Sequence, residues 1–219
     1  MRLFIAEKKG LGEVIALALG NGVNRGGYIE CGTDVVTWGS GHLLELVKPE
    51  SHNPAYEKWN EADLPLKLRP HRYQPIERTA GQFKTVAALI EKASEIVHAG
   101  DPDAEGQLLI DEILRWFDYK KPVKRLNTGD TTRGGLVKAL SHMTDNNDSL
   151  NEGWSAYARS VADLMIGVNM SRFFTCSNSG VLLAVGRVQT PTLGLVVKRD
   201  MQIEGHIKTV YYDIFADVN

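Results

Sequence analysis

The sequence predicts an α/β fold: a mostly parallel sheet with flanking helices, followed by a smaller, mainly α region. Two observations lead to this class. Short apolar runs alternate with helical patterns up to about residue 150, and the long patterns beyond have helical spacing. The chain has 219 residues, 43% of them hydrophobic and 24% charged, with a formal net charge of −2. This ordinary composition excludes wholesale disorder and a strongly basic, polyanion-binding character.

The expected elements follow from apolar spacing along the chain. Strands are expected where short apolar or alternating runs are bounded by turn residues, and helices where apolar residues recur every three or four positions. The expected strands are residues 2–6, 28–31, 35–38, 95–99 and 123–126. The expected helices are residues 11–19, 79–93, 107–117, 135–143, 154–174 and 190–199. Prolines concentrate in residues 48–75, which predicts an irregular excursion there.

A polar run at residues 144–149 predicts a domain boundary. We therefore expect one domain at residues 1–150 and a second, mainly helical part at residues 151–219. Residues 211–218 alternate as a strand does, but no partner strand follows them. This incomplete strand favours a chain that is a piece of something longer.

No window approaches 18 uninterrupted apolar residues, and charge follows the amino terminus too soon for a secretory signal. The two cysteines, Cys31 and Cys176, form no C-x-x-C pair, which argues against a structural zinc site and against a disulfide framework. These features predict a cytoplasmic protein with no membrane span.

Acidic residues directly follow two of the predicted strands. Glu7 follows residues 2–6, while Asp101, Asp103 and Glu105 follow residues 95–99. If the strands are neighbours, their carboxyl ends meet at one edge of the sheet, and alternate residues of an extended segment share one side. Four converging carboxylates repel one another unless a cation lies among them. An all-oxygen donor set suits Mg²⁺, and magnesium in turn suggests phosphoryl chemistry.

Two other interpretations of the second acidic segment stay open. Residues 101–106 with Glu112 nearly form an EF-hand calcium loop, although the residues before them are β-like and Pro102 fits that loop poorly. The simplest interpretation is that these are solvated loop carboxylates.

Five stretches, in order, resemble type IA DNA topoisomerases, most closely the topoisomerase III branch. They are residues 3–8 (LFIAEK), 41–45 (GHLLE), 101–107 (DPDAEGQ), 162–172 (ADLMIGVNMSR) and 185–191 (VGRVQTP). The resemblance covers nearly the whole chain. It implies a Rossmann-like TOPRIM domain at residues 1–150, then part of a helical domain that binds single-stranded DNA. Members of this family are ATP-independent isomerases.

The resemblance implies roles for the acidic residues and their neighbour. Glu7 would lie beside the scissile phosphate and assist proton transfer, while Lys8 would stabilise developing charge or protonate the leaving 3′ oxygen. Glu7, Asp101 and Asp103 would hold Mg²⁺, with Glu105 completing or supporting the site. Taken alone, Lys8 is more simply a solvated turn lysine.

Contacts with single-stranded DNA are implied by the same resemblance. Arg159 and Asp163, four positions apart on a predicted helix, match residues that line a pocket for a base or phosphate. As an isolated pair they are more often a surface ion pair. Arg187 and Gln189 match residues there too. Arg172 is an additional phosphate candidate, equally consistent with a structural role.

The chain departs from the family's pattern at several points. Lys9 and Gly10 stand where the family often has Pro-Ser, and Ala104 where it often has arginine. The family's tyrosine-bearing domain is not matched, and neither Tyr211 nor Tyr212 has the surroundings of the nucleophile. We expect a fragment that binds Mg²⁺ and single-stranded DNA, does not relax DNA alone, and has the remainder of a topoisomerase as a candidate partner.

Two other function classes stay open. A naturally shortened, non-catalytic DNA-binding or regulatory module would carry the same motifs. A TOPRIM nuclease or primase would share the acidic residues, but residues 186–189 (GRVQ) argue against it because those enzymes lack this stretch.

Several other residues are expected to have structural roles. His42 and His98 are expected to pack or to form hydrogen bonds rather than to bind metal. Trp38, Trp59 and Trp116 are expected in the core.

Overall fold

The computed structural model describes residues 1–178 and 181–217. Contacts divide the chain into two compact units. The first comprises residues 1–58 and 65–165, and the second comprises residues 59–64 together with the described residues from 166 onward. This division by contacts lies within α5 (Leu150–Ser177).

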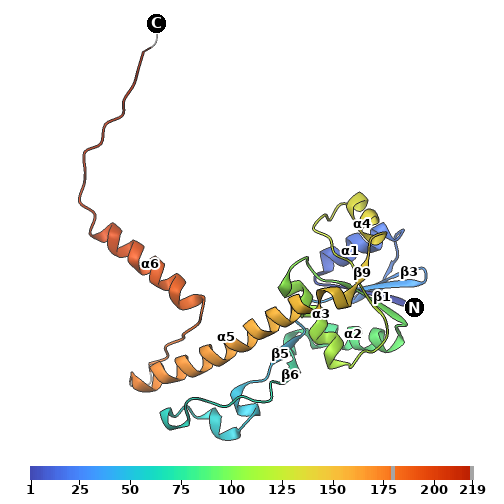
Figure 1. Cartoon of the computed structure of the whole chain (residues 1–219), viewed down its shortest axis with the longest axis horizontal. Helices are drawn as coiled ribbons and strands as arrows, with labels where there is room; N and C mark the ends of the chain where they lie inside the picture. The colour runs from blue at the N-terminus through green and yellow to red at the C-terminus, as the bar shows by residue number, and fades with distance from the viewer. Residues whose placement is uncertain (179–180, 218–219) are drawn as a thin grey trace. The chain divides into compact units, whose positions relative to one another are not determined.

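A seven-stranded mixed sheet forms the centre of the first unit, in the order β2-β3-β4-β1-β7-β8-β9 (Figure 1). The four middle strands are parallel: β4 (Asp34–Trp38), β1 (Arg2–Ala6), β7 (Glu95–Ala99) and β8 (Val123–Arg125). The other three pair antiparallel: β2 (Val23–Asn24), β3 (Tyr28–Cys31) and β9 (Thr144–Asp145). The predicted parallel arrangement is therefore confirmed for the centre of the sheet.

Helices cover both faces of this sheet. Leu3 and Ile5 of β1 pack with α2 (Ala80–Lys92) and α3 (Ala104–Trp116). The alternate residues Phe4 and Ala6 belong to the cluster that includes α1 (Lys9–Ala18) and α4 (Arg133–Leu140). Burial on both faces explains why β1 is a continuous apolar run. Full burial of a side chain such as Phe4 contributes about 1.5–3 kcal/mol to stability.

The polar run at residues 144–149 does not form a linker. It contains β9, which pairs with β8, and the 3₁₀ helix η5 (Asn146–Ser149). Asn146 is buried and hydrogen-bonded to Gln107 and Asp111 of α3. A polar side chain can be buried when its hydrogen bonds are satisfied, and composition alone does not reveal such partners.

Short elements interrupt the proline-rich excursion. Three 3₁₀ helices lie in it, η1 (Pro49–Ser51), η2 (Pro54–Glu57) and η3 (Glu61–Asp63), and η4 (Glu77–Thr79) precedes α2. A separate two-stranded sheet pairs β5 (Leu44–Leu46) with β6 (Tyr73–Pro75).

The core prediction for tryptophan is correct at one position of three. Trp38 is buried at 4% exposure, whereas Trp59 is 41% and Trp116 43% exposed. Each exposed ring still has one partner. The Arg172 guanidinium lies over the Trp59 ring, and the Phe83 ring contacts Trp116 in an edge-to-face arrangement. Partial cover of this kind is common for large aromatic side chains.

In the second unit, α6 (Gln189–Glu204) follows the end of α5, and residues 205–217 contain no helix or strand. The strand expected at residues 211–218 is therefore wrong over residues 211–217, and residue 218 lies outside the described residues. A strand requires a neighbour for its ladder of hydrogen bonds, and alternation alone does not supply one. Within the described ranges, no helix is both long and apolar enough to cross a bilayer.

Candidate active site

The acidic residues after β1 and β7 meet at the carboxyl edge of the sheet. The two strands pair in parallel with Ala6 opposite Ala99, so the residues that follow them emerge together. The main-chain N–H of Asp101 donates a hydrogen bond to Glu7 Oε2 at 3.3 Å. Lys8 Nζ lies 2.9 Å from Glu7 Oε1 and 3.0 Å from Asp101 Oδ2. The structure thus brings Glu7, Lys8 and Asp101 into one group.

The Lys8 ammonium joins two carboxylates while remaining accessible. The hydrogen bonds that Lys8 donates, first to Glu7 and then to Asp101, raise the pKa of Lys8, so it stays charged at neutral pH. Its side chain is 61% exposed, whereas that of Glu7 is only 12% exposed. Solvent therefore reaches the ammonium directly, and an incoming anion such as a phosphate could contact it.

Asp103 and Glu105 do not join this group. Asp103 Oδ1 accepts a hydrogen bond from the main-chain N–H of Gly106 at 2.7 Å and thereby caps α3. Glu105 pairs with Arg159 and with His42 Nε2, the latter at 3.2 Å. The expected convergence of four carboxylates assumed an extended segment. Because the cap starts the helix at Ala104, the strand-like alternation stops there and the side chains diverge.

His42 bridges two glutamates beside the site. Its Nδ1 lies 2.9 Å from Glu112 Oε1, and its other ring nitrogen faces Glu105. The bond to Glu112 raises the pKa of His42 to about 9, so the ring is cationic at neutral pH. Burial raises the pKa of the Glu112 carboxyl, and His42 opposes that rise. Sequence analysis expected a hydrogen-bonding His42 but did not identify Glu112, 70 residues away, as its partner.

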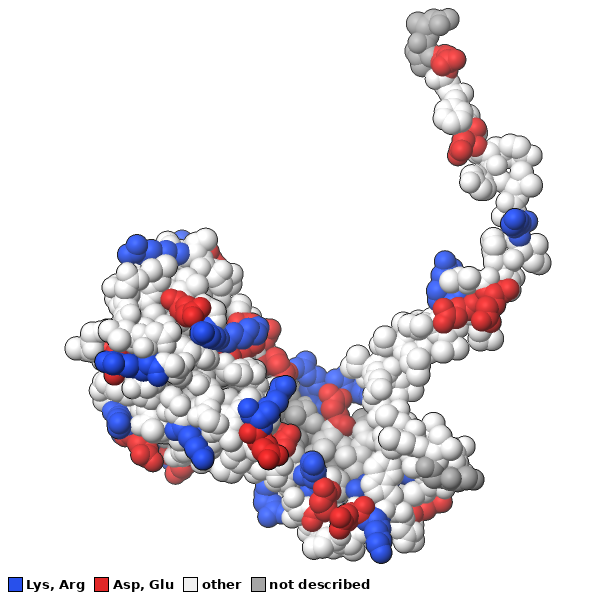
Figure 2. Space-filling model, turned by 180° about the vertical axis from the view of Figure 1, so that it is seen from behind, with Lys and Arg blue, Asp and Glu red and all other residues white. Residues whose placement is uncertain are grey.

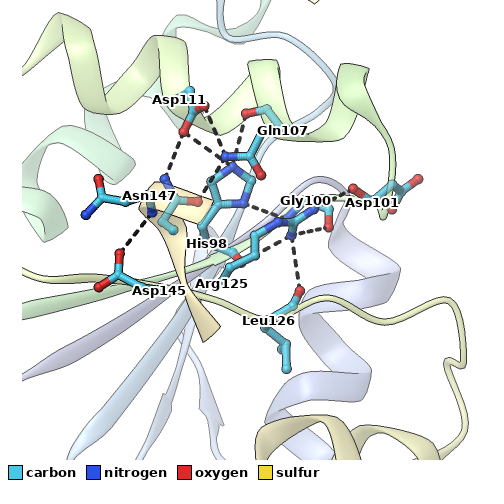
Figure 3. Close-up of polar contacts among 10 residues, drawn as sticks. His98, Gly100, Asp101, Gln107, Asp111, Arg125, Leu126, Asp145 and Asn147 are labelled. Atoms are coloured by element: carbon cyan, nitrogen blue, oxygen red, sulfur yellow. Dashed lines mark hydrogen bonds and ion pairs between the residues drawn. The ribbon is translucent and has the colours of Figure 1, made fainter. Parts of the chain in front are cut away.

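A buried polar network lies next to the acidic loop (Figure 3). His98 of β7 is fully buried, and burial, aided by the charge of Arg125, lowers its pKa to about 3. Its Nε2 lies 3.0 Å from the carbonyl oxygen of Gln107, and the N–H of Gly100 donates to Nδ1 at 3.3 Å. A carbonyl oxygen only accepts, so the neutral ring carries its proton on Nε2.

The same network encloses a buried carboxylate. Asp111 accepts hydrogen bonds from Gln107 Nε2 at 3.0 Å and from Asn146 Nδ2 at 3.2 Å. Burial raises the pKa of Asp111, and these two hydrogen bonds act in the opposite direction. Sequence analysis missed this network. The available signals were a histidine inside the apolar run of residues 95–99 and an arginine at position 125 beside a predicted strand.

The carboxylates of the site suit a magnesium ion that is bound together with a phosphate. Within the described part of the chain, no three or more His, Cys, Asp or Glu side chains are grouped to hold a metal ion. Glu7 and Asp101 nevertheless present carboxylate oxygens toward one positive group. Magnesium is usually bound by one or two carboxylates plus waters and substrate phosphates. The residues present therefore fit Mg²⁺ bound together with a phosphate, rather than an ion enclosed by protein alone.

The DNA-binding candidates of the first unit lie on α5. Arg159 pairs with Glu105, and its side chain is about half exposed, while Asp163 is exposed. Figure 2 shows Lys and Arg side chains interspersed with Asp and Glu on the visible face, with no broad basic patch. A DNA contact here would therefore depend on single residues rather than on a large positive field.

The remaining DNA-binding candidates belong to the second unit. Arg172 is 4% exposed, with its guanidinium 5.1 Å from the centre of the Trp59 ring, which favours a structural role. Arg187 and Gln189 are exposed. Arg187 lies in the turn before α6, and Gln189 is the first residue of α6. The Gly186 N–H donates to Thr190 Oγ1 at 3.0 Å, and the Thr190 N–H donates back to the Gly186 carbonyl at 3.1 Å.

A cavity of about 670 Å³ lies in the first unit, between the carboxyl end of α3 and the start of α5. None of Glu7, Lys8 and Asp101 lines it. The cavity is therefore separate from the group that Glu7, Lys8 and Asp101 form at the sheet edge.

Comparisons with known proteins identify the families that the chain resembles. Residues 2–129 match the Toprim domain family, and residues 147–219 match the DNA topoisomerase family. The chain is 41% identical to DNA topoisomerase 3 of Salmonella typhimurium, covering 100% of this chain and 35% of that protein. It is 42% identical to DNA topoisomerase 3 of Vibrio cholerae, covering 98% of this chain and 35% of that protein. The chain thus spans about a third of the length of these relatives.

A solved structure shows the same fold. Full-length topoisomerase I from Thermotoga maritima superimposes with a TM-score of 0.63 at 21% identity, covering 94% of this chain and 31% of that one. The sheet-edge position of Glu7 and Asp101 is common in α/β folds that bind ligands at strand ends. The chain belongs to the Toprim family and continues from its Toprim domain into the start of a DNA topoisomerase domain.

Proposed function

We propose that this chain is the amino-terminal part of a type IA DNA topoisomerase of the topoisomerase III kind. It supplies the Mg²⁺-binding acidic site and part of the groove for single-stranded DNA that serves strand cleavage, passage and religation. The single observation that carries the proposal is the meeting of Glu7, Lys8 and Asp101 at the sheet edge. The similarity of nearly the whole chain to about a third of proteins named DNA topoisomerase 3 supports it.

In this proposal, residues of this chain transfer protons and stabilise charge at the scissile phosphate. A tyrosine hydroxyl from the remainder of the protein attacks phosphorus, and the bond from phosphorus to the 3′ oxygen breaks. Glu7 takes up the hydroxyl proton, and Lys8 gives a proton to the leaving 3′ oxygen. Religation reverses both transfers.

Magnesium would be held by Glu7 and Asp101. When bound, it supplies positive charge that orients the phosphate oxygens and offsets their charge. Asp103 and Glu105 are the additional ligands that the family resemblance suggests. The Asp103 cap uses only Oδ1, so its other carboxylate oxygen is not committed to Gly106. Both Glu105 oxygens already have partners, His42 at Oε1 and Arg159 at Oε2.

The exposed polar residues of the two units would contact the single strand. Arg159 with Asp163, and Arg187 with Gln189, offer donors and acceptors for phosphates and base edges. Arg172, being buried against Trp59, would act through packing.

The test is to mix the chain with a separately produced remainder that carries the tyrosine. A labelled single-stranded oligonucleotide and Mg²⁺ are added, and covalent protein–DNA adducts are counted on a denaturing gel. We expect adducts from the mixture and none from either part alone. Replacement of Glu7 by Gln should lower adduct formation about 10²–10⁴-fold, the range typical for loss of a general acid or base.

Glu13→Gln is the matched control because Glu13 is an exposed carboxylate that pairs with Lys9. Normal adduct formation by Glu7→Gln would contradict the assignment of Glu7. Relaxation of supercoiled plasmid by the 219-residue chain alone would contradict the need for the remainder. DNA binding with no adduct in any mixture would favour a non-catalytic DNA-binding module instead.

A further inference from the structure

Arg125, the last residue of β8, is a buried arginine whose acceptors are main-chain carbonyl oxygens. It is 2% exposed. Its Nη1 donates to the carbonyl oxygens of His98 (3.3 Å), Gly100 (2.8 Å) and Leu126 (3.1 Å), and Nη2 donates to that of Asp101 (2.8 Å). In Figure 3 the guanidinium points at the turn formed by Gly100 and Asp101.

Fold stability alone does not account for this arginine. A buried charge is costly to remove from water, and hydrophobic replacements of buried ionic groups are often neutral or stabilising. Within the described residues, Arg125 Nε is buried with no hydrogen-bond partner, which adds to the cost. What the guanidinium provides, and an apolar side chain would not, is a rigid set of donors aimed at several carbonyl groups.

The same turn is held from its other side by His98 and Glu7. The Gly100 N–H donates to His98 Nδ1, and the Asp101 N–H donates to Glu7 Oε2. Both peptide N–H groups and both carbonyl groups of Gly100 and Asp101 are thus engaged, with Arg125 taking the two carbonyls. A main chain fixed at four points leaves the Asp101 carboxylate only its own side-chain rotations.

We propose that Arg125 is a positioning residue that, together with His98, holds the Gly100–Asp101 main chain so that the Asp101 carboxylate faces Glu7 and Lys8. The inference rests on the proposed function for its catalytic consequence, since Asp101 matters there as a ligand of Mg²⁺. Arg125 acts through the loop, because its guanidinium donates to main-chain carbonyl oxygens and not to the Asp101 carboxylate. A misplacement of a catalytic group by about 1 Å can lower the reaction rate on the order of a hundredfold.

The variants Arg125→Lys and Arg125→Met test this role in the full chain. Lysine keeps the charge but loses the planar set of donors, and methionine loses both. We expect the Mg²⁺ concentration for half-maximal adduct formation, in the mixture with the tyrosine-bearing remainder, to rise at least tenfold for Arg125→Met and less for Arg125→Lys. Single-stranded DNA affinity without Mg²⁺ should stay within twofold of wild type.

Arg2→Met is the matched control, because Arg2 lies at the amino end of β1, away from the site, and pairs with Asp34 at 2.6 Å. It should lower stability without moving the Mg²⁺ requirement. Folded Arg125 variants whose Mg²⁺ requirement stays within twofold of wild type would overturn the proposal, because a purely structural arginine predicts that result.

A second measurement needs no variant and no remainder of the protein. Amide hydrogen exchange of the wild-type chain, followed by NMR, should show the Gly100 and Asp101 amides as protected as that of Val97 within β7. Exchange as fast as that of the loop residue Gly129 would overturn the proposal even if the Arg125 variants fail to fold. Slow exchange with no adducts from the wild-type mixture would leave the positioning role intact and count against the proposed function alone.

Discussion

The two histidines near the site hold opposite charges at neutral pH for reasons that their surroundings make clear. His42 lies between Glu105 and Glu112, and these carboxylates favour the cationic ring. His98 lies inside the sheet with Arg125 nearby, and both burial and that charge favour the neutral ring. Protonation state here is therefore set by neighbours and not by residue type.

Acid should destabilise the fold through His98. Its pKa is about 3 when folded, below the ordinary value of 6.5, so the unfolded chain binds the proton more readily. The stability this residue contributes is present above pH 6.5 and is lost as pH falls from 6.5 toward 3. Urea unfolding at successive pH values should show a steeper fall in the unfolding free energy for the wild-type chain than for His98→Asn. His206→Asn, which replaces an exposed histidine, should keep the wild-type slope.

Asp103 can be tested as a helix cap separately from any metal role. Its carboxylate accepts the Gly106 N–H, so Asp103→Ala should lower the unfolding free energy by about 0.5–2 kcal/mol. Asp103→Asn retains a capping oxygen and should stay within a few tenths of a kcal/mol in urea unfolding without Mg²⁺. If both variants lose the same stability, the carboxylate charge and not the cap is what matters.

At the scale of elements, the loop that carries Asp101 lies in close contact with the first turn of α3 at Gly106. A Cβ placed on Gly106 would lie 2.5 Å from both the N and the O of Asp101. No side chain fits there unless the backbone moves. Glycine at position 106 therefore allows the cap of α3 and the loop that carries Asp101 to share one small space.

Two helical glycines provide a matched pair of substitutions. Gly81 in α2 has nothing within 4 Å of an added Cβ, so Gly81→Ala should raise stability by about 0.5–1 kcal/mol through helix propensity. Gly106→Ala brings the same propensity but collides with main-chain atoms of Asp101, and it should be strongly destabilising. Thermal unfolding of the two variants should move in opposite directions. A stabilised Gly106→Ala chain would show that the loop can move away freely.

The sequence predicted the sheet edge well because that part depends on local pattern. The strands at residues 2–6 and 95–99 are found at those positions, and parallel pairing then places Glu7 near Asp101. The divergence of Asp103 and Glu105 was not foreseen, because a helix cap overrode the spacing of an extended chain. The Arg125 contacts could not be predicted from the sequence for another reason. They join segments about 25 residues apart through main-chain groups, which residue identity does not encode.

At the scale of the whole molecule, the two units differ in how much of their main chain lies in secondary structure and is buried from solvent. The first unit contains the sheet and both apolar clusters. In the second unit, residues 205–217 have no helix or strand, and the side chains of Tyr211 and Tyr212 are 83% and 86% exposed. Local stability should therefore be lowest in this last stretch.

Limited proteolysis should reveal this difference. Chymotrypsin cleaves after aromatic residues, and its first cut in the native chain should fall at Tyr211, Tyr212 or Phe215, because exposed, unstructured segments enter proteases readily. Mass spectrometry of the early products would identify the site. The urea-unfolded chain, in which all aromatic residues are available, is the control. A first native cut within residues 1–165 would mean that the first unit opens more easily than its packing indicates.

The place of β1 at the middle of the sheet affects how the protein is made. β1 is synthesised first, but both strands that pair with it come later in the chain. β4 ends at Trp38, and β7 ends only at Ala99. While the ribosome is still translating the residues between them, one side of β1 has hydrogen-bonding groups that nothing yet occupies. Nascent chains that stall in this interval carry an open, apolar strand, which is the kind of edge that chaperones must cover to prevent aggregation.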